Sequence, residues 1–515
     1  MKSIIGKDHV RRSASQILFD ESRLTVGIPD EVYYPETLED VAFVVKKAMS
    51  ENKTITGIGG QTGITGSGVP NEGCIAVCFE NMNRILRVEN DKDRAAVLVC
   101  QPGVTLEDIE SFLESPAHWP QSVAGSGGLE AERWFYSPDP TEMTAQLGGT
   151  VATNASGARS FRFGSTRKHV VYLKIMLSTG DMLTITRGDQ IFTVDGINLR
   201  TDNGGTIHVP ALSYRSPDSK NASGYFSQPD MDLIDLFIGS EGTLGIFCEI
   251  GIRLLPKSVF TAGLSFFSSR SDAFAFAEIL RSRQDVSAIE YFDSTALDFI
   301  ARHKAELNLH LPDFPAQSQT AVFWEHAGKD DEAFEERLDE WEEHLQSCNA
   351  TFDNTWSGLE PAERTRLRAF RHAIPEAVNH TVAEYKKSVP EIRKIGTDTA
   401  VPANAFRKVF YDYLHLIKKS NLQAVIFGHL GDYHLHFNLL PASREQLQTA
   451  RTLYEQMMTI AVEAGGTISA EHGIGKIKAG YLKKMYGQDG VRSMKEVKEA
   501  LDPGWMLNRG TLFGE

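Results

Sequence analysis

Residues 57–68, GIGGQTGITGSG, place six glycines in twelve positions, directly after a short apolar stretch. Glycine lets the backbone approach a ligand closely and exposes consecutive N–H groups to an anion. The two commonest phosphate-binding patterns are missing. A dinucleotide fingerprint needs a glycine where Thr62 stands, and the P-loop pattern ending at Gly475-Lys476 lacks its first glycine and its Ser/Thr. The loop is therefore expected to bind a phosphorylated cofactor by another route, and tight NAD recognition is not supported.

Further turns of similar composition follow along the chain. They are LGGTVATNASGARSFRFGSTR (147–167), KNASGY (220–225) and GSEGTLG (239–245). Each mixes glycine with short side chains that form hydrogen bonds, and each is a weak signal alone. Together with residues 57–68 they form four turns around strand units, which favours one extended ligand such as a dinucleotide.

The rest of the chain reads as short helices and strands without the long regular crossovers of a doubly wound sheet. Thr37 predicts the start of a helix within 35–53, and Gly180-Asp181 predicts a hairpin turn within 169–185. Residues 235–256 read as strand, glycine turn and strand, and 187–230 as a surface insertion. After Pro256 the pattern becomes helical and acidic, so a domain boundary is expected near residue 258.

The composition is that of an ordinary globular protein. A length of 515 residues predicts two or three domains, and a net charge of −15 argues against a nucleic-acid partner. The five cysteines include no CxxC pair, which predicts reduced core residues of a cytoplasmic protein. We expect neither a secretory signal nor a transmembrane segment, because no apolar run reaches the required length.

The stretch GHLGDYHLHFN (428–438) carries three histidines within eight positions. Strand alternation puts His434 and His436 on one face, and His429 lies in the preceding loop, where it can reach that face. Two imidazoles suit Zn²⁺ if a carboxylate joins them, and SAEHGIG (469–475) supplies Glu471 beside His472. From these residues alone, a metal site and a polar surface both remain open.

The glycine turns resemble the FAD-binding domain of the vanillyl-alcohol oxidase and p-cresol methylhydroxylase superfamily. GGQTGITG resembles its pyrophosphate loop, and SPDPTEMTAQLGGTVATNASGARSFRFG and GSEGTLGI resemble its later flavin-binding turns. The resemblance implies an α+β fold. A two-subdomain FAD-binding domain is expected at 1–258, an α+β cap domain with an antiparallel sheet at 259–465, and a C-terminal segment that returns to the FAD domain at 466–515.

The same match implies the residues that contact the cofactor. Gln61 and Thr62 stand where members with covalent flavin often carry histidine, so noncovalent FAD is expected. Asn508 belongs to a C-terminal stretch resembling a family ending with Asn-Pro-Gly, although Arg509 replaces the proline. The expected cofactor-binding residues are Gly59, Gly60, Gln61, Thr62, Gly63, Gly66, Gly148, Gly149, Thr153, Asn154, Ser156, Gly157, Gly239, Glu241, Gly242, Gly245, Ile246 and Asn508.

The histidine motifs GHLGDYHLHFN and SAEHGIGKIK resemble the hallmarks of the D-2-hydroxyacid dehydrogenase branch. This branch includes D-lactate and D-2-hydroxyglutarate dehydrogenases and the flavin subunit of glycolate oxidase. The resemblance implies that His429, His436 and Glu471 bind a divalent metal, with zinc expected, and that His472 is the general base. Tyr433 and His434 replace a glycine and an asparagine of the family pattern.

Two cations are matched to the substrate by the same resemblance. Arg371, in RLRAFRHAIPEAVN (366–379), resembles the carboxylate-binding arginine, and Lys394, in KIGTDTAVP (394–402), is a second catalytic candidate. Arginine suits a carboxylate because its guanidinium donates a planar pair of hydrogen bonds.

The function expected is FAD-dependent oxidation of a D-2-hydroxyacid to the 2-oxoacid, by hydride transfer to flavin N5 with metal-assisted deprotonation of the hydroxyl. D-Lactate is the leading substrate, and D-2-hydroxyglutarate and glycolate are alternatives. A flavin-free zinc hydrolase and a non-redox enzyme like alkylglycerone-phosphate synthase are more distant ones. The electrons are expected to pass to an external quinone, cytochrome, electron-transferring flavoprotein or partner subunit, with any membrane contact peripheral.

Overall fold

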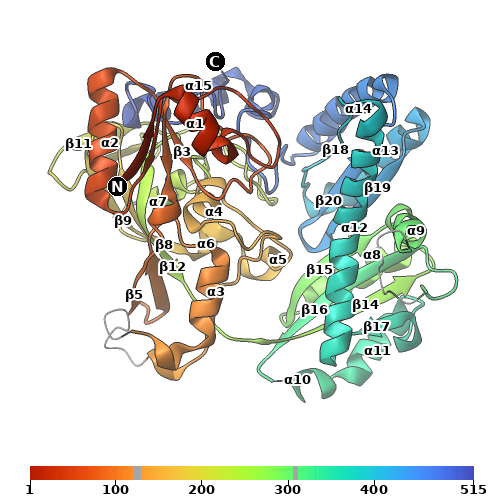
Figure 1. Cartoon of the computed structure of the whole chain (residues 1–515). Helices are drawn as coiled ribbons and strands as arrows, with labels where there is room; N and C mark the ends of the chain where they lie inside the picture. The colour runs from red at the N-terminus through yellow and green to blue at the C-terminus, as the bar shows by residue number, and fades with distance from the viewer. Residues whose placement is uncertain (121–128, 306–310, 312, 331, 515) are drawn as a thin grey trace.

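The chain folds into two lobes that face each other (Figure 1). The computed structural model describes residues 1–120, 129–305, 311, 313–330 and 332–514. The first lobe holds the elements up to β12 and, from the other end of the chain, helix α15 (Leu482–Leu501). The second lobe holds the elements from β14 to α14. None of the described helices combines the length and the apolar character that a membrane span requires.

A four-stranded sheet in the first lobe carries the first glycine loop. Its strands run in the order β1 (Lys2–Ile5), β2 (Glu31–Tyr34), β4 (Ile75–Cys78), β3 (Ile55–Ile58). Helix α2 (Leu38–Glu51) packs against it. As predicted, α2 begins after Thr37, whose hydroxyl accepts the N–H of Asp40 while the Asp40 carboxylate accepts the N–H of Thr37. Strand β3 ends where the loop 59–68 begins, so the sheet fixes the position of this loop.

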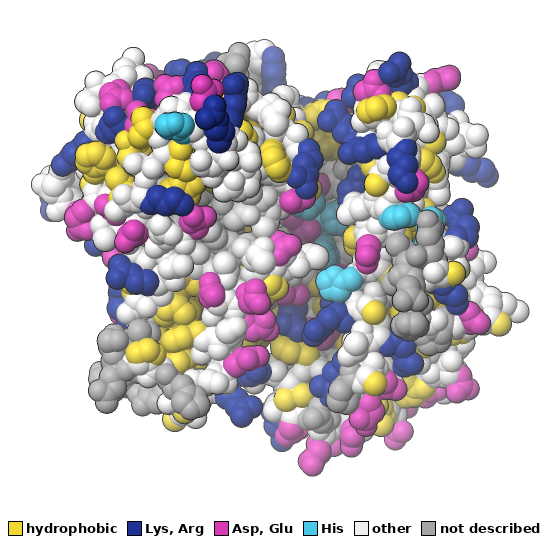
Figure 2. All heavy atoms as spheres, in the orientation of Figure 1, with side chains coloured by type: hydrophobic (Ala, Val, Ile, Leu, Met, Phe, Trp, Pro, Cys, Tyr) yellow, Lys and Arg dark blue, Asp and Glu magenta, His cyan; other side chains and the backbone are white. Residues whose placement is uncertain are grey.

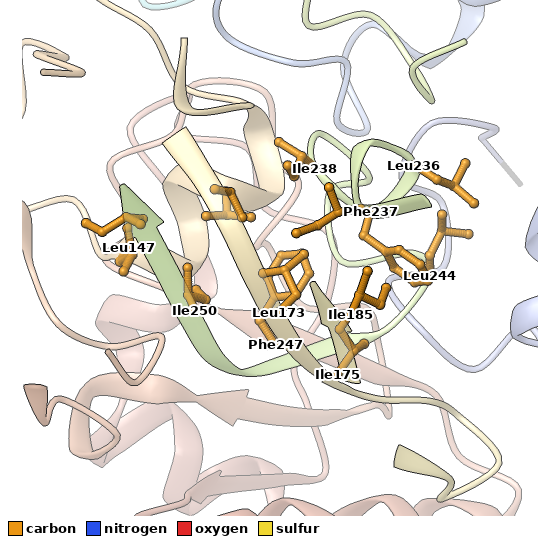
Figure 3. Packing of buried hydrophobic residues seen from close by; sticks show 14 of the residues in the cluster. Leu147, Leu173, Ile175, Ile185, Leu236, Phe237, Ile238, Leu244, Phe247 and Ile250 are labelled. Atoms are coloured by element: carbon orange, nitrogen blue, oxygen red, sulfur yellow. The ribbon is translucent and has the colours of Figure 1, made fainter. Parts of the chain in front are cut away.

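A five-stranded antiparallel sheet forms the other half of the first lobe. Its order is β5 (Ile85–Asn90), β6 (Ala96–Cys100), β12 (Ile246–Arg253), β8 (Val170–Met176), β9 (Met182–Thr186). The predicted hairpin at Gly180-Asp181 is confirmed, because β8 and β9 pair on either side of it. Apolar side chains from β8 and β12 pack against those of α7 (Leu233–Phe237) and of the glycine turn that follows it (Figure 3). This core supports the turns at 147–157 and 239–245.

The second lobe is built on a seven-stranded antiparallel sheet. Its order is β17 (Thr355–Ser357), β14 (Val259–Phe267), β16 (Thr320–Gly328), β15 (Val286–Phe292), β19 (Ala424–His429), β20 (His434–Leu439), β18 (Ile395–Gly396). One face packs against α9 (Ser294–His303) and α12 (Pro361–Ser388). The other face packs against α8 (Arg270–Ser282), α11 (Leu338–Ser347), α13 (Ala403–Ser420) and α14 (Arg444–Glu463). The predicted α+β class with an antiparallel sheet is confirmed.

Two local predictions were wrong. The segment from Asp235 forms part of helix α7 rather than a strand, because the Asp232 carboxylate accepts the N–H of Ile234 and starts a helix. A short run that is apolar throughout cannot be assigned to helix or strand by its periodicity. Residues 187–230 are more than a surface insertion. They include the hairpin of β10 (Ile197–Arg200) and β11 (Thr206–Val209), and Lys220 is nearly inaccessible to solvent.

Candidate active site

A cavity of about 350 Å³ opens between the glycine turns of the first lobe. This volume lies within the range of ligand-binding pockets. Its lining comes mainly from residues within the stretches 57–68, 148–156 and 241–247, together with Asn508 from the C-terminal segment. Asn508 is held there because its N–H donates to the carbonyl of Ile55 and its side-chain NH₂ donates to the carbonyl of Glu241. The cavity therefore joins stretches that are distant in the sequence.

Most of the predicted cofactor-binding residues line this cavity. They are Gly59, Gly60, Gln61, Thr62, Gly63, Gly148, Gly149, Thr153, Ser156, Glu241, Gly242, Gly245, Ile246 and Asn508. Glu471 and His472 line the same cavity, which links it to the predicted metal site. KNASGY is the turn that contributes no lining residue among those described, and its Lys220 points instead to Glu471.

The other four predicted cofactor residues shape the turns themselves. Gly66 and Gly239 adopt positive φ angles of 79° and 85°, which favour glycine. Gly157 packs so closely on Asp139 that a Cβ would lie 2.2 Å from its carbonyl oxygen. Asn154 ends α4 (Leu147–Thr153) in the left-handed conformation, and its side-chain Oδ1 accepts the backbone N–H of Arg167 at 2.9 Å. Their residue types are explained by the protein's own packing.

Gly149 lies in the cavity wall with open space beside its backbone. A Cβ placed on Gly149 would meet no atom of the rest of the protein within 4 Å, and its φ lies outside the left-handed range. The fold itself therefore does not demand glycine here, although helix α4 would be more stable with alanine. We interpret the glycine as leaving room in the cavity for a bound molecule to lie directly against the backbone.

Substitution of Gly149 tests this interpretation. We expect Gly149→Leu to weaken FAD binding by about tenfold to a hundredfold, since overpacking costs about 1–3 kcal/mol. The apoprotein should unfold at nearly the same temperature as wild type, because the added side chain enters empty space. FAD affinity is measured by titrating apoprotein and following flavin fluorescence.

The matched control for Gly149 is Gly480→Leu. A Cβ on Gly480 also meets nothing within 4 Å, but Gly480 lies outside the cavity lining. FAD affinity should be unchanged in this control. Equal FAD affinity in Gly149→Leu and wild type would show that the cofactor does not contact this turn.

The three predicted metal ligands lie together in the hollow between the two lobes, where Figure 2 shows histidine and charged side chains. His429 ends β19, His436 lies on β20, and Glu471 follows α14. The paired strands place both histidines beside the carboxylate, with His429 Nε2 3.3 Å from Glu471 Oε1 and His436 Nε2 3.8 Å from Glu471 Oε2. One potential ligand atom from each of these residues lies within 4.8 Å of the others.

The protonation states of this group suit a divalent cation. Burial, with help from His434, lowers the pKa of His436 to about 3, so its imidazole is neutral. Burial alone would raise the pKa of Glu471, but Lys220 and the histidines hold it well below its ordinary value, so it is a carboxylate. Burial alone would lower the pKa of His429, but Glu471 and Glu290 raise it above its ordinary value, so a metal would displace a proton from this imidazole on binding. Two imidazoles and a carboxylate form a donor set that Zn²⁺ accepts, with room for a further ligand.

Contacts behind the histidines orient them toward the same point. His436 Nδ1 lies 3.1 Å from the carbonyl oxygen of Thr397, and His429 Nδ1 lies 3.2 Å from Glu290 Oε1. An acceptor at Nδ1 holds the proton there and leaves Nε2 free to bind a metal, as at His436. The contact of His429 with Glu290 is close but lacks hydrogen-bond geometry. The residues of this group therefore fit the expected metal.

His434 is a neighbour of this group with a different contact. It is completely buried, its Nε2 lies 3.2 Å from Asp398 Oδ1, and its Nδ1 lies 3.9 Å from Glu471 Oε2. The density of histidines in the sequence made the three look equivalent, but Asp398 holds one edge of the His434 ring.

His472 lies where the metal group meets the cofactor cavity. Its Nδ1 is 3.0 Å from Asp398 Oδ2, and its side chain is about one-third exposed to the hollow. Burial alone would raise the pKa of Asp398, but His472 and Lys478 hold it well below its ordinary value. An ionised carboxylate on Nδ1 fixes the ring and leaves Nε2 available to accept a proton.

The two predicted substrate cations are placed differently. Arg371 donates through Nε to Glu290, which is also the carboxylate beside His429. Lys394 is exposed, and its ammonium donates to Asn379 Oδ1 at 3.0 Å. Arg371 is therefore joined to the metal group through one glutamate, whereas the contact of Lys394 is with helix α12.

Sequence reasoning missed three buried residues of this site: Glu290, Asp398 and Lys220. Lys220 Nζ contacts Glu471 Oε1 at 2.5 Å, Asp432 Oδ2 at 3.2 Å and the carbonyl oxygen of Gly157 at 3.3 Å. Its place in KNASGY was the one available signal, because that turn had already been singled out. Glu290 stands in an apolar strand, where a lone charged residue was the overlooked sign.

Comparison with known proteins agrees with this arrangement. Residues 29–129 and 126–186 match the FAD binding domain family, and residues 255–512 match the family described as FAD linked oxidases, C-terminal domain. A D-2-hydroxyglutarate dehydrogenase of Stutzerimonas stutzeri is 28% identical over 94% of this chain and 91% of its own length. A D-lactate dehydrogenase of Anaerostipes hadrus is 27% identical over 94% and 89%.

The fold also resembles a solved structure of an alkyldihydroxyacetonephosphate synthase. The TM-score is 0.60 at 16% identity, and the match covers 94% of this chain and 76% of the other. This likeness shows that the two chains share their overall fold. The C-terminal family match alone spans just over half of the 515 residues. With its FAD-binding domain and its matched C-terminal domain, this chain belongs to the FAD-linked oxidases, a family of flavin-dependent oxidoreductases.

Proposed function

We propose that this enzyme oxidises a D-2-hydroxyacid, with D-lactate as the first candidate, to the corresponding 2-oxoacid. The observation that carries the proposal is the place of His472, which lines the cofactor cavity and directly follows Glu471 of the metal group. A hydroxyacid bound there can meet a base, a metal and a flavin at once. The dehydrogenase names of the two relatives support this substrate class.

Arg371 is the proposed partner of the substrate carboxylate. Arg371 donates a hydrogen bond from Nε to Glu290. Its two Nη groups can then donate together to a substrate carboxylate. The guanidinium also lies over the ring of Phe323 at 4.6 Å, which restricts its orientation. Glu290 thereby positions both the substrate-binding arginine and a metal ligand.

His472 is the proposed base for the substrate hydroxyl. Asp398 fixes its Nδ1 side, so Nε2 accepts the hydroxyl proton and the imidazolium that forms is stabilised by the buried carboxylate. A divalent ion held by His429, His436 and Glu471 would act as a Lewis acid on the substrate oxygens. Noncovalently bound FAD would accept the hydride from C2, and an external acceptor would then reoxidise it.

The two lobes are assigned to separate domains. We propose residues 1–258 as the FAD-binding domain, 259–465 as the cap and 466–515 as the segment that returns to the FAD-binding domain. In support, β14 starts at Val259 in the second lobe, and Asn508 hydrogen-bonds to Ile55 in the first. Lys394 is kept as a secondary substrate contact, because it lies one residue before β18, which pairs with β20.

Anaerobic bleaching of the bound flavin tests the proposed function. The purified protein is mixed with matched D- and L-enantiomers of 2-hydroxyacids, and absorbance near the flavin maximum is followed. D-Lactate should bleach the flavin at least about tenfold faster than L-lactate, because the positions of base, metal and arginine fix one face of C2. A colourless protein, or a yellow protein that no D-2-hydroxyacid bleaches, would refute the proposal.

A further inference from the structure

The sheet face that carries the metal group also carries two buried glutamates. In the register of β15 and β16, Glu290 lies opposite Phe323, and Glu325 lies opposite Ala288. Phe323 and Ala288 belong to the cluster that packs against α12, so strand alternation puts both glutamates on this side of the sheet. The neighbouring strand β19 brings His429 to the same face, 3.2 Å from Glu290.

Two arginines meet these glutamates, and they are paired in different ways. Arg371 contacts Glu290 through Nε. Arg159, which comes from the other lobe just before α5 (Ser160–Phe163), holds Glu325 with two bonds, Nε–Oε1 at 2.8 Å and Nη2–Oε2 at 3.0 Å. Ser287 Oγ donates a further bond to Glu325 Oε1 at 2.6 Å. The Nε and Nη2 groups of Arg159 thus both donate to Glu325.

The ion pairs Arg371–Glu290 and Arg159–Glu325 are neighbours on this face of the sheet. Burial alone would lower the pKa of Arg371, but Glu290 first, and then Asp139 and Glu325, raise it above its ordinary value. Arg159 also lies over the ring of Phe260 at 3.8 Å, and its N–H donates to Asp139 Oδ1 at 3.0 Å. Arg371 lies over the ring of Phe323, and Glu325, which Arg159 holds, follows two residues later on the same strand and the same face. The pair of Arg159 and Glu325 is therefore the neighbour of Arg371, and each of these two arginines has a carboxylate partner.

From this arrangement we infer that Glu325 determines substrate specificity, by neutralising Arg159 in the wall that faces the substrate side chain beyond C2. This inference rests on the proposed oxidation of a 2-hydroxyacid. A substrate with a single carboxylate places it on Arg371 and the metal, and its uncharged side chain meets the neutral wall. A second carboxylate would approach Arg159 and Arg371, each of which is already paired with a glutamate, beside the acid Asp139. The enzyme is thereby selective for monocarboxylic 2-hydroxyacids.

Glu325→Gln tests the inference, because it keeps the shape of the side chain while it frees the charge of Arg159. The ratio of kcat/KM for D-2-hydroxyglutarate over D-lactate should be below one in wild type. In Glu325→Gln it should rise by about tenfold or more, the size of effect expected for one charge-assisted hydrogen bond. The double variant Arg159→Gln/Glu325→Gln should lose this gain, since the freed arginine provides it. Glu325→Asp should restore the wild-type preference.

The matched control is Asp285→Asn. Asp285 forms a two-bond pair with Arg283, at 2.9 and 2.8 Å, next to the ring of Trp341 on the opposite face of the same sheet. Its loss should leave the substrate ratio unchanged. An unchanged ratio in folded, yellow Glu325→Gln, or a wild type that already prefers the dicarboxylate, would overturn the inference.

A binding measurement separates this inference from the proposed function. Glutarate and propionate cannot be oxidised at C2, and their binding is followed by the change in the absorption spectrum of oxidised flavin. Glutarate should bind Glu325→Gln about tenfold more tightly than wild type, and propionate equally to both. If no 2-hydroxyacid reduces the flavin but glutarate binding still improves, the proposed function fails and the charge-neutral wall stands. If Glu325→Gln oxidises D-lactate but binds glutarate no more tightly than wild type, the role of Glu325 in specificity is refuted and the proposed function is not.

Discussion

Replacing His472 with alanine is expected to slow flavin reduction by D-lactate by about 10²–10⁴-fold, the usual contribution of a positioned general base. His472 is the proposed acceptor of the hydroxyl proton, and its ring is fixed by the 3.0 Å contact with Asp398. Without it the proton must pass to solvent. The rate is measured by stopped-flow mixing of enzyme and substrate without oxygen, so that the step after substrate binding is observed alone.

The FAD and metal contents should stay at wild-type levels in His472→Ala. The side chain of His472 is partly exposed and is not one of the three proposed ligands, although it forms a second group with Asp398 and Glu471 whose ligand atoms lie within 4.8 Å of one another. Metal lost together with His472 would assign the ion to this second group. A matched control is His415→Ala, an exposed histidine on helix α13, which should reduce its flavin normally. If His472→Ala reduced its flavin as fast as His415→Ala, the proton would have another acceptor.

Local chemistry pointed to the glycine turns that line the cavity, and the family resemblance pointed to the histidines of the proposed metal group. Glycine and short polar side chains mark turns directly, and period-2 alternation put His436 on the polar face of its strand. The structure adds that Gly149 has empty space around it whereas Gly157 does not. Sequence alone could not separate these roles, because both glycines stand in the same motif. Their difference depends on Asp139, which packs against one and not the other.

The residues that sequence reasoning missed act through contacts across the fold. Lys220 meets Glu471 from 251 positions away, and Glu325 meets Arg159 from 166 positions away. A single buried charge in a strand has no local pattern, since its partner is set by how the two lobes meet. The prediction of a strand at α7 was wrong for the opposite reason. The local pattern was ambiguous, and the side chain of Asp232 started a helix.

His434 illustrates how tertiary contact separates residues that look equivalent in sequence. It lies opposite His429 in the strand pairing and shares a face with His436. Asp398 takes its Nε2 side, while Nδ1 is 3.9 Å from Glu471. Asp398 also accepts N–H groups from Glu471 and His472, each at 3.2 Å. One buried aspartate thus orders the turn that carries both a proposed metal ligand and the proposed base.

Removing the charge of Glu471 is expected to have the largest effect of all. Glu471→Gln keeps the size of the side chain but replaces the one carboxylate of the proposed ligand set by a neutral amide. Loss of Lewis-acid assistance, worth several kcal/mol, should slow flavin reduction by about 10³-fold or more. Metal per chain, measured by mass spectrometry after dialysis, should fall with it. Chelation of wild type should produce the same loss, and added Zn²⁺ should restore wild type only.

Glu455→Gln is the matched control. Glu455 is a glutamate of helix α14 whose carboxylate lies 3.0 Å from Lys484 Nζ, and it does not belong to the metal group. It should keep both metal and activity. The charge at Glu471 matters in two ways, since Lys220 Nζ also lies 2.5 Å from it and would face an amide instead. If added Zn²⁺ bound to Glu471→Gln without restoring the rate of flavin reduction, Glu471 would act by orienting its neighbours rather than by binding the metal. Full-rate bleaching in wild-type protein stripped of its metal would exclude the Lewis-acid role, because the flavin would then be reduced by substrate with only Arg371 and His472 in place.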